Sequence, residues 1–175
     1  MWNPKNPSVA NVEKLKRKID KLRKGTIVRL GGMTDCFQPI ELDNRITYKI
    51  IKYLNKRRIG YLIVTKSSIV ANDEYLKIYD KDLAHFQITV TTTDDSKSVK
   101  YEKATVPSKR IEAIEKLYKN GFDVQVRLSP FIYEYIDFDI LNNIKCNKIS
   151  IVIEQQGLNH CLMQKMVVIL IWKQK

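Results

Sequence analysis

Polar residues able to bind a charged ligand follow the apolar runs of this sequence at four places. The first is the stretch LGGMTDCFQPIE at residues 30–41. Gly31 and Gly32 permit backbone conformations that are closed to other residues, and they let a ligand approach the main chain. Thr34 and Asp35 add a hydroxyl and a carboxylate at the same point. The alternative is an ordinary turn between a strand and a helix, in which Asp35 caps the helix.

The other three places each close a run that predicts a buried strand. Lys66 directly follows YLIVT, so its ammonium group would point towards the edge of a sheet and could meet a carboxylate or phosphate, although surface lysines are common. Thr89 and Thr91 alternate with Val90 and share one face of a strand, although β-branched threonine also favours strands without any function. Arg127 lies within DVQVRL, and a charged residue on a strand buried on both faces requires a partner or a cavity. Arg127 therefore indicates a polar interior.

The histidines and cysteines form no recognisable catalytic or metal-binding pattern. His85 opens a predicted strand and His160 lies in a poorly patterned stretch, so we interpret both as surface histidines. Cys36, Cys146 and Cys161 are far apart and show no CxxC spacing, which argues against a zinc site. An odd number of scattered cysteines fits reduced thiols in a cytoplasm better than a disulfide framework.

Composition and charge limit the possible classes of protein. The 175 residues are enough for one domain with a sizeable core, and 44% apolar with 29% charged residues excludes a mainly disordered chain. The net charge of +12 should attract polyanions such as nucleic acid, although AT-rich genomes also raise lysine content. The most apolar run, MVVILIW at 166–172, is far shorter than the roughly 20 residues that a membrane span requires. We expect no membrane segment and a cytoplasmic location.

The elements that would position these residues can be read from hydrophobic periodicity. Residues 1–25 predict a basic amphipathic helix, over Val12 to Lys24, whose outer face contacts phosphates or is simply solvated. Strand-like and helix-like segments then alternate, which predicts βαβ units and an α/β fold with a parallel sheet. This is either an open doubly wound sheet or part of a (β/α) barrel, and both bind ligands at the carboxyl ends of their strands. The expected strands are 26–30, 61–65, 85–92, 123–128 and 148–154, and the expected helices are 42–57, 73–79, 108–120 and 138–143.

Taken together, these places resemble the radical S-adenosylmethionine (SAM) superfamily, in its branch of spore photoproduct lyase and related DNA-repair-photolyase-like proteins. The resemblance runs through LGGMTDCFQPIE, VTKSSIV, FQITVTTTDD, EKATVPSKRIEAIEKLYKNG and VQVRLSP, in that order. It implies a parallel-stranded partial (β/α) barrel, or partial TIM barrel, that is incomplete at the N-terminus. It also implies a lyase-type radical enzyme of DNA repair with DNA as a partner. Its cofactors would be S-adenosylmethionine and a four-iron four-sulfur cluster, an iron-sulfur group at the strand C-termini.

The resemblance also assigns roles to the four places. The glycines and the hydroxyl of the first stretch would lie where such proteins bind the amino group of the cofactor. The lysine would contact its carboxylate, the two threonines would face its ribose, and the arginine would face the barrel interior. The cofactor-binding residues implied in this way are Gly31, Gly32, Thr34, Asp35, Lys66, Thr89, Thr91 and Arg127.

The departures from the family concern the cluster. Family members carry CxxxCxxC before the glycine stretch, because three thiolates hold the cluster and leave one iron open for the cofactor. No such motif occurs in this sequence. We therefore expect a truncated family member that is not catalytic by itself and whose partner is a missing N-terminal segment carrying the cluster. The family-like domain would span 26–154, followed by a divergent tail at 155–175. The alternatives are a basic nucleic-acid-binding module without catalysis, or an inert product with an exposed sheet edge.

Overall fold

The fold is built on one six-stranded sheet whose strands follow the chain in sequential order. The computed structural model describes residues 9–32, 34–154 and 166–172, of which 153–154 and 166–172 are described by backbone alone. Strands β1 to β5 are parallel and β6 is antiparallel to β5. The strands are β1 (Ile27–Leu30), β2 (Gly60–Thr65), β3 (Ala84–Thr89), β4 (Asp123–Leu128), β5 (Lys148–Glu154) and β6 (Met166–Trp172). The predicted α/β class with five parallel strands is confirmed.

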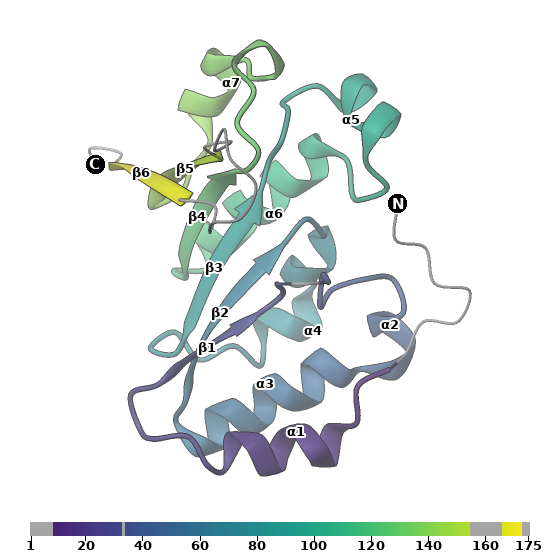
Figure 1. Ribbon diagram of the computed structural model, residues 1–175, viewed down its shortest axis with the longest axis vertical. Coiled ribbons are helices and arrows are strands. Elements are labelled where there is room, and N and C mark those ends of the chain that lie inside the picture. The colour runs from purple at the N-terminus through teal and green to yellow at the C-terminus, as the bar shows by residue number, and fades with distance from the viewer. Residues whose placement is uncertain (1–8, 33, 155–165, 173–175) are drawn as a thin grey trace, which may run out of the picture.

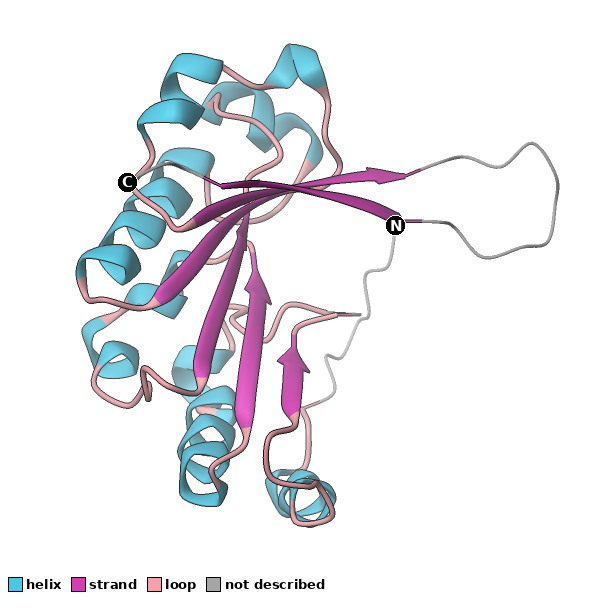
Figure 2. Cartoon of the chain, turned by 90° about the vertical axis from the view of Figure 1, so that its left-hand side faces the viewer, coloured by secondary structure: helices cyan, strands magenta, loops and turns pink. Residues whose placement is uncertain are grey.

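Sequential strand order distinguishes the two architectures that the sequence left open. A doubly wound sheet reverses its strand order, which sends helices to both faces, whereas an unreversed order keeps the crossover helices on one face. Figure 2 shows most of the helices on one side of the fan of strands, and the opposite face carries no helical layer among the described residues. The arrangement is that of a partial (β/α) barrel. The helices are α1 (Val12–Ile19), α2 (Glu41–Asn44), α3 (Ile46–Arg57), α4 (Asp73–Leu76), α5 (Asp95–Tyr101), α6 (Pro107–Lys119) and α7 (Phe138–Asn143), with 3-10 turns η1 (Ser68–Ala71) and η2 (Tyr133–Tyr135).

The core lies between the sheet and these helices, and strand periodicity selects its members. Along β4 buried and half-buried residues alternate strictly, so Val124, Val126 and Leu128 face the helices. The helices contribute residues such as Leu54 of α3 and Leu117 of α6, both fully buried. An aromatic cluster fills the same layer and comprises Phe37, Tyr75, Tyr79, Phe86 and Phe122. Its edge-to-face pairs have ring centroids 4.8 to 5.7 Å apart, and the tilted pair of Tyr75 and Tyr79, at 6.4 Å, joins them.

Several expected boundaries differ from the structure. The helix expected over 42–57 is two helices, α2 and α3, because Arg45 between them adopts a left-handed conformation with φ 55°. The helix expected over Val12 to Lys24 ends at Ile19, and the strand expected over 85–92 ends at Thr89. Helix α5 and strand β6 were not predicted. Helix α5 begins where Asp94 accepts hydrogen bonds from the backbone of two following residues, which is a typical N-cap.

Helix α1 packs along α3 (Figure 1), and its contacts fix it against the rest of the layer. Ile19 of α1 is buried, and the Tyr53 hydroxyl of α3 donates a 2.8 Å hydrogen bond to Asp20. The predicted division at residues 25 and 154 stays a prediction. Of the tail at 155–175, residues 155–165 and 173–175, which include His160 and Cys161, lie outside the described part of the chain.

Candidate cofactor-binding site

The carboxyl ends of β1, β2 and β3 meet at one edge of the sheet, because the three strands are parallel neighbours. The loop after β1 begins with Gly31, whose φ of +84° lies in the left-handed region. A Cβ at this position would overlap the backbone carbonyl oxygen of Val64 in β2. A Cβ on Gly32 would meet nothing within 4 Å. Gly31 is therefore required for the loop to press against β2, and Gly32 leaves the main chain open.

Asp35 ties this loop to the end of β2. Its carboxylate accepts hydrogen bonds from the Thr65 hydroxyl at 2.7 and 2.8 Å and from the Lys66 backbone N–H at 2.7 Å. It also accepts one from the Phe37 backbone N–H at 2.9 Å, which makes a tight turn. Asp35 does not cap a helix, because α2 begins at Glu41 with Ile40 at its N-cap position, and ligand binding by Asp35 stays a prediction. Its internal contacts make it a positioning residue for the lysine that follows β2.

Glu41 fixes the other end of the loop, and the sequence reasoning missed it. Its buried carboxylate accepts 2.9 Å hydrogen bonds from the backbone N–H groups of Thr47 and Tyr48 at the start of α3. The Tyr75 hydroxyl donates a third, at 2.6 Å. Burial and then this hydrogen bond to Glu41 raise the pKa of Tyr75. A carboxylate just before a helical run was the available signal, since such residues commonly satisfy free N–H groups at helix starts.

Lys66 belongs to a charged cluster at the ends of β2 and β3. Its Nζ lies 2.5 Å from Glu102 Oε2, and its side chain is 36% exposed, so the side chain is partly accessible to solvent. The Thr91 hydroxyl donates to Glu102 Oε1 at 3.0 Å, and the Tyr101 hydroxyl donates to Thr91 at 3.1 Å. Thr91 therefore lies beyond the end of β3 and is held by Glu102.

Arg110 of α6 completes this cluster, and it is fully buried. Its guanidinium group donates to the Glu102 carboxylate, to the Thr89 carbonyl at 3.0 Å and to the Thr105 carbonyl at 2.5 Å. Burial alone would raise the pKa of Glu102, but the hydrogen bond from Lys66 and the charge of Arg110 outweigh it and hold that pKa below its ordinary value. Lys66, Arg110 and Glu102 make two cations and one anion, and the Asp35 carboxylate at the Lys66 backbone brings the local charges into balance. Lys66 is partly exposed, so its remaining donors can meet an anionic group of a ligand.

The sheet face opposite the helices carries polar side chains on β3, β4 and β5, as Arg127 indicated, whereas β2 presents Leu62 and Val64 on it. Gln87 of β3 and Gln125 of β4 are register neighbours whose amide groups lie 3.5 Å apart, and the Ser150 hydroxyl of β5 donates to Gln125 at 3.1 Å. Arg127 is the register partner of Thr89, and this pair lies nearer the carboxyl edge than Gln87 and Gln125. At the other end of this face, His85, expected at the surface, is half buried and its Nδ1 lies 2.9 Å from Asp123.

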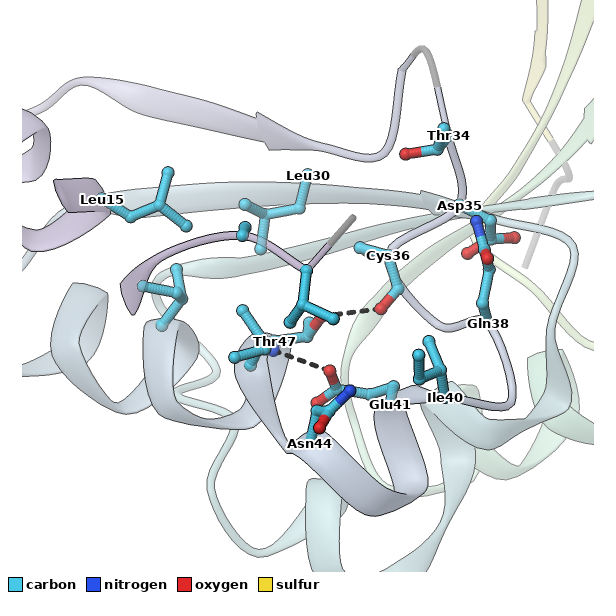
Figure 3. A pocket seen from close by; sticks show the side chains of 14 residues that line it. Leu15, Leu30, Thr34, Asp35, Cys36, Gln38, Ile40, Glu41, Asn44 and Thr47 are labelled. Atoms are coloured by element: carbon cyan, nitrogen blue, oxygen red, sulfur yellow. Dashed lines mark hydrogen bonds between the residues drawn. The ribbon is translucent and has the colours of Figure 1, made fainter. Parts of the chain in front are cut away.

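A cavity of about 250 Å³ lies beneath the loop after β1, on the side of the helices (Figure 3). Thr34 and Asp35 line it from the loop, and Leu15 and Leu30 line it from α1 and β1. Thr34, an exposed residue, thus lies at a space lined by both polar and apolar residues. Thr34 and Asp35 line this cavity, whereas Gly31, Gly32, Lys66, Thr89, Thr91 and Arg127 do not, so the structure does not gather the predicted set around one cavity.

Known proteins share part of this sequence and this arrangement of strands. An uncharacterised protein of Methanocaldococcus jannaschii is 31% identical over 117 residues, which are 65% of this chain and 44% of that protein. Spore photoproduct lyase complexed with dinucleoside spore photoproduct superposes with a TM-score of 0.56 at 16% identity, over 75% of this chain and 40% of that one. This chain has the fold of spore photoproduct lyase. No family model matches it.

A second structure agrees with the spore photoproduct lyase fold. The enzyme anSMEcpe with bound AdoMet and a peptide gives a TM-score of 0.50 at 12% identity, over 85% of this chain and 44% of that one. The predicted resemblance and the partial barrel are confirmed at the level of the fold. This chain spans less than half the length of each of these proteins.

The described residues of this spore photoproduct lyase-like fold do not suit an iron-sulfur cluster. Cys36 follows the carboxyl end of β1, whereas Cys146 precedes the amino end of β5, so the two thiols lie at opposite edges of the sheet. Burial, and then the charge of Asp35, raise the pKa of Cys36 well above its ordinary value, which keeps it a neutral thiol rather than a metal-binding thiolate. No group of three potential metal ligands occurs in the described parts of the chain. Nor is any helix in those parts long and apolar enough to cross a membrane.

Proposed function

We propose that this chain is the S-adenosylmethionine-binding part of a radical SAM protein of the DNA-repair lyase type. The observation that carries the proposal is the partly exposed side chain of Lys66, whose ammonium group pairs with Glu102 at the carboxyl edge of the sheet, beside a loop whose glycine backbone approaches the same edge. A ligand with a carboxylate and neighbouring polar groups suits such an edge. When bound, the cofactor would supply a sulfonium bond that can be cleaved reductively.

The residues at this edge divide into contacts and supports. Lys66 has three N–H donors and Glu102 takes one, so donors remain for the cofactor carboxylate. The main chain at Gly32 and the hydroxyl of Thr34 are exposed and would accept the amino group. Thr91 donates to Glu102, so its role would be to position the charged side chains of Glu102 and Lys66. The neighbouring Thr89 would flank the ribose.

The cluster ligands would come from outside this sequence, as a segment carrying CxxxCxxC. Strand order supports this proposal because β1 is an edge strand, and an edge strand can pair with a further strand. The polar face with Gln87 and Gln125 would then lie inside a more complete barrel. Side-chain amides pair well with the edges of nucleobases, which agrees with DNA as the substrate class.

Calorimetric titration of the full chain with S-adenosylmethionine tests the cofactor proposal. Replacing Lys66 by methionine should weaken binding about 10- to 100-fold, the equivalent of one hydrogen bond to a charged group. The control Lys100→Met removes an exposed lysine of α5 and should leave affinity unchanged. Absence of saturable binding to the unmodified chain, or equal affinity of the two variants, would refute the proposal.

Iron analysis tests the origin of the cluster separately. The chain is reconstituted anaerobically with iron and sulfide, alone and together with a segment carrying CxxxCxxC. We expect stoichiometric iron only in the mixture, because three suitably placed thiolates are needed. Stoichiometric cluster iron in the chain alone would show that its own residues suffice. If neither sample contains iron, the proposal of a radical enzyme is refuted. Cofactor binding would still be tested separately by the titration.

A second candidate function is nucleic-acid binding without catalysis. Residues 9–58 contain 14 Lys and Arg against 5 Asp and Glu, so this third of the chain holds +9 of the total net charge of +12. A polyanion would be attracted to that surface, and its binding should weaken steeply as salt rises. A gel-shift titration in which neither DNA nor RNA shows salt-sensitive retention would refute this function.

A further inference from the structure

A basic groove runs along the outer surface between α1 and α3. It encloses about 740 Å³, and five cationic side chains line it beside one carboxylate, that of Glu13. The cationic residues are Lys16, Arg45, Lys49, Lys52 and Lys56. Two of them have carboxylate partners, since Lys16 pairs with Glu13 at 2.7 Å and Arg45 pairs with Glu74 at 2.5 Å. The groove therefore keeps an excess of positive charge.

Helix geometry makes the charge of this groove continuous. Lys49, Lys52 and Lys56 are spaced by three and four residues along α3, so they lie on one face of the helix and are separated by about 5 Å of rise per step. All three side chains are exposed. A row of cations at this spacing fits a polyanion with repeated charges better than a single phosphate.

Two tyrosine rings lie among these cations. Tyr48 and Tyr53 of α3 are half buried and line the groove. The Arg45 guanidinium lies 4.3 Å from the centroid of the Tyr48 ring, and Lys16 Nζ lies 5.5 Å from that of Tyr53. Cations combined with aromatic rings in a groove are typical of proteins that bind single-stranded nucleic acid, where bases stack on rings and phosphates contact lysines.

A membrane surface fits this groove less well. Membrane-binding helices expose an apolar face, whereas the apolar residues of α1 pack against α3 and leave lysines outward. We propose that the groove between α1 and α3 binds single-stranded nucleic acid, with phosphates on Lys49, Lys52 and Lys56 and bases on Tyr48 and Tyr53. This inference rests on the second candidate function and names its surface. It is independent of cofactor binding.

The position of the groove relates it to the candidate cofactor site. Arg45 is the N-cap residue of α3, and the loop from the carboxyl end of β1 reaches this helix through α2. The other end of the groove, at Lys56, lies one helix length away. A single-stranded nucleic acid bound along α3 would therefore approach the carboxyl edge of the sheet without covering Lys66, which does not line the groove.

Fluorescence anisotropy with a labelled single-stranded oligonucleotide tests the inference on the full chain. The test variant is Lys49→Gln/Lys52→Gln/Lys56→Gln, and the matched control is Lys100→Gln/Lys103→Gln/Lys119→Gln, which removes equal charge from exposed positions outside the groove. Loss of three phosphate contacts should lower the slope of log affinity against log salt by about 2, which corresponds to about 100-fold weaker binding at 0.1 M salt. The control should keep its slope and affinity.

A second pair of variants tests the stacking contribution. Tyr53→Leu should weaken binding about 5- to 100-fold without changing the salt slope, because a neutral ring carries no phosphate contact. Tyr118→Leu, at an exposed ring of α6, should have no effect. Thermal unfolding of each variant verifies that the fold is retained.

Each contrary result has a distinct meaning. Equal loss in the lysine variant and its control would overturn the groove while leaving nucleic-acid binding intact as a function. No binding by the unmodified chain would overturn both. Equal affinity for a duplex of the same sequence, or for vesicles of anionic phospholipid, would overturn the assignment to single strands.

Discussion

Replacing Arg110 by methionine should strongly destabilise the fold, and the structure gives a basis for the magnitude. Arg110 is fully buried and donates to Glu102 and to two carbonyl groups, at the end of β3 and before α6. Methionine would leave a largely buried carboxylate with one partner fewer and two carbonyls without this donor. Breaking a buried ion pair by removing one member costs about 3–5 kcal/mol. Arg110→Lys keeps the charge but loses the fork of donors, so its cost should be intermediate.

Lys66→Met provides the comparison, because Lys66 binds the same carboxylate from a side chain that is 36% exposed. A partly exposed ion pair contributes about 0–1 kcal/mol. With a urea dependence of about 2 kcal/mol per M, the unfolding midpoint should fall by about 2 M for Arg110→Met and by at most about 0.5 M for Lys66→Met. Urea unfolding followed by circular dichroism measures both. Equal midpoints for the two variants would show that burial does not determine the contribution of each cation, and the reasoning would be refuted.

Three further predictions follow from single contacts. Gly31→Ala should lower the free energy of unfolding by about 2 kcal/mol or more, because Gly31 has a positive φ and a Cβ there would overlap Val64. The control Gly32→Ala should change that free energy by less than about 0.5 kcal/mol. Equal effects of the two variants in thermal unfolding would contradict this geometry of the loop. The pKa of Glu102 is lower in the folded chain than its ordinary value of 4.5, so its ionised form stabilises the fold above that value. This stability is lost as the pH falls through the lower folded pKa. The free energy of unfolding of Glu102→Gln, measured between pH 3 and 6, should therefore depend less on pH than that of the unmodified chain. Cys36, whose pKa is raised by burial, should react with iodoacetamide far more slowly in the folded chain than in urea, and equal rates monitored by mass spectrometry would show that the thiol is not protected.

Most of the fold could be predicted because it depends on local periodicity. All five parallel strands lie within a few residues of their expected positions, since alternating or continuous apolar runs bounded by turn residues are strong signals. The break between α2 and α3 could not be predicted, because Arg45 carries no local signal for a left-handed conformation. The carboxylate of Glu41, which receives the first N–H groups of α3, makes that break possible through a contact six residues along the chain. Strand β6 lies in the stretch expected to be a divergent tail, because the resemblance to the family ends before it.

The candidate site was predicted less completely, because partners distant in sequence determine its geometry. The sequence marked the strand ends, and Lys66 does lie there with Asp35 beneath its backbone. It did not predict Arg110, a residue of an amphipathic helix whose pattern gives no reason for a buried charge. Its burial follows from Glu102, eight residues earlier, which turns back towards the sheet. The threonines were correctly placed near the edge, but only coordinates distinguish Thr91, held by Glu102, from Thr89, whose carbonyl accepts from Arg110.

The internal hydrogen bonds of the acidic side chains bear on which ligands this molecule can attract. Asp35 and Glu41 accept hydrogen bonds from backbone N–H groups and neighbouring hydroxyls, and Glu102 accepts from Arg110 and Lys66. These three acidic side chains are therefore occupied inside the fold, where they hold the loop after β1, the start of α3 and the end of β3. The lysines of α3 are exposed, and the side chain of Lys66 is partly exposed. The groove on α3 therefore favours a polyanion, whereas at the carboxyl edge of the sheet Lys66 can meet a single carboxylate of a ligand that also carries positive charge.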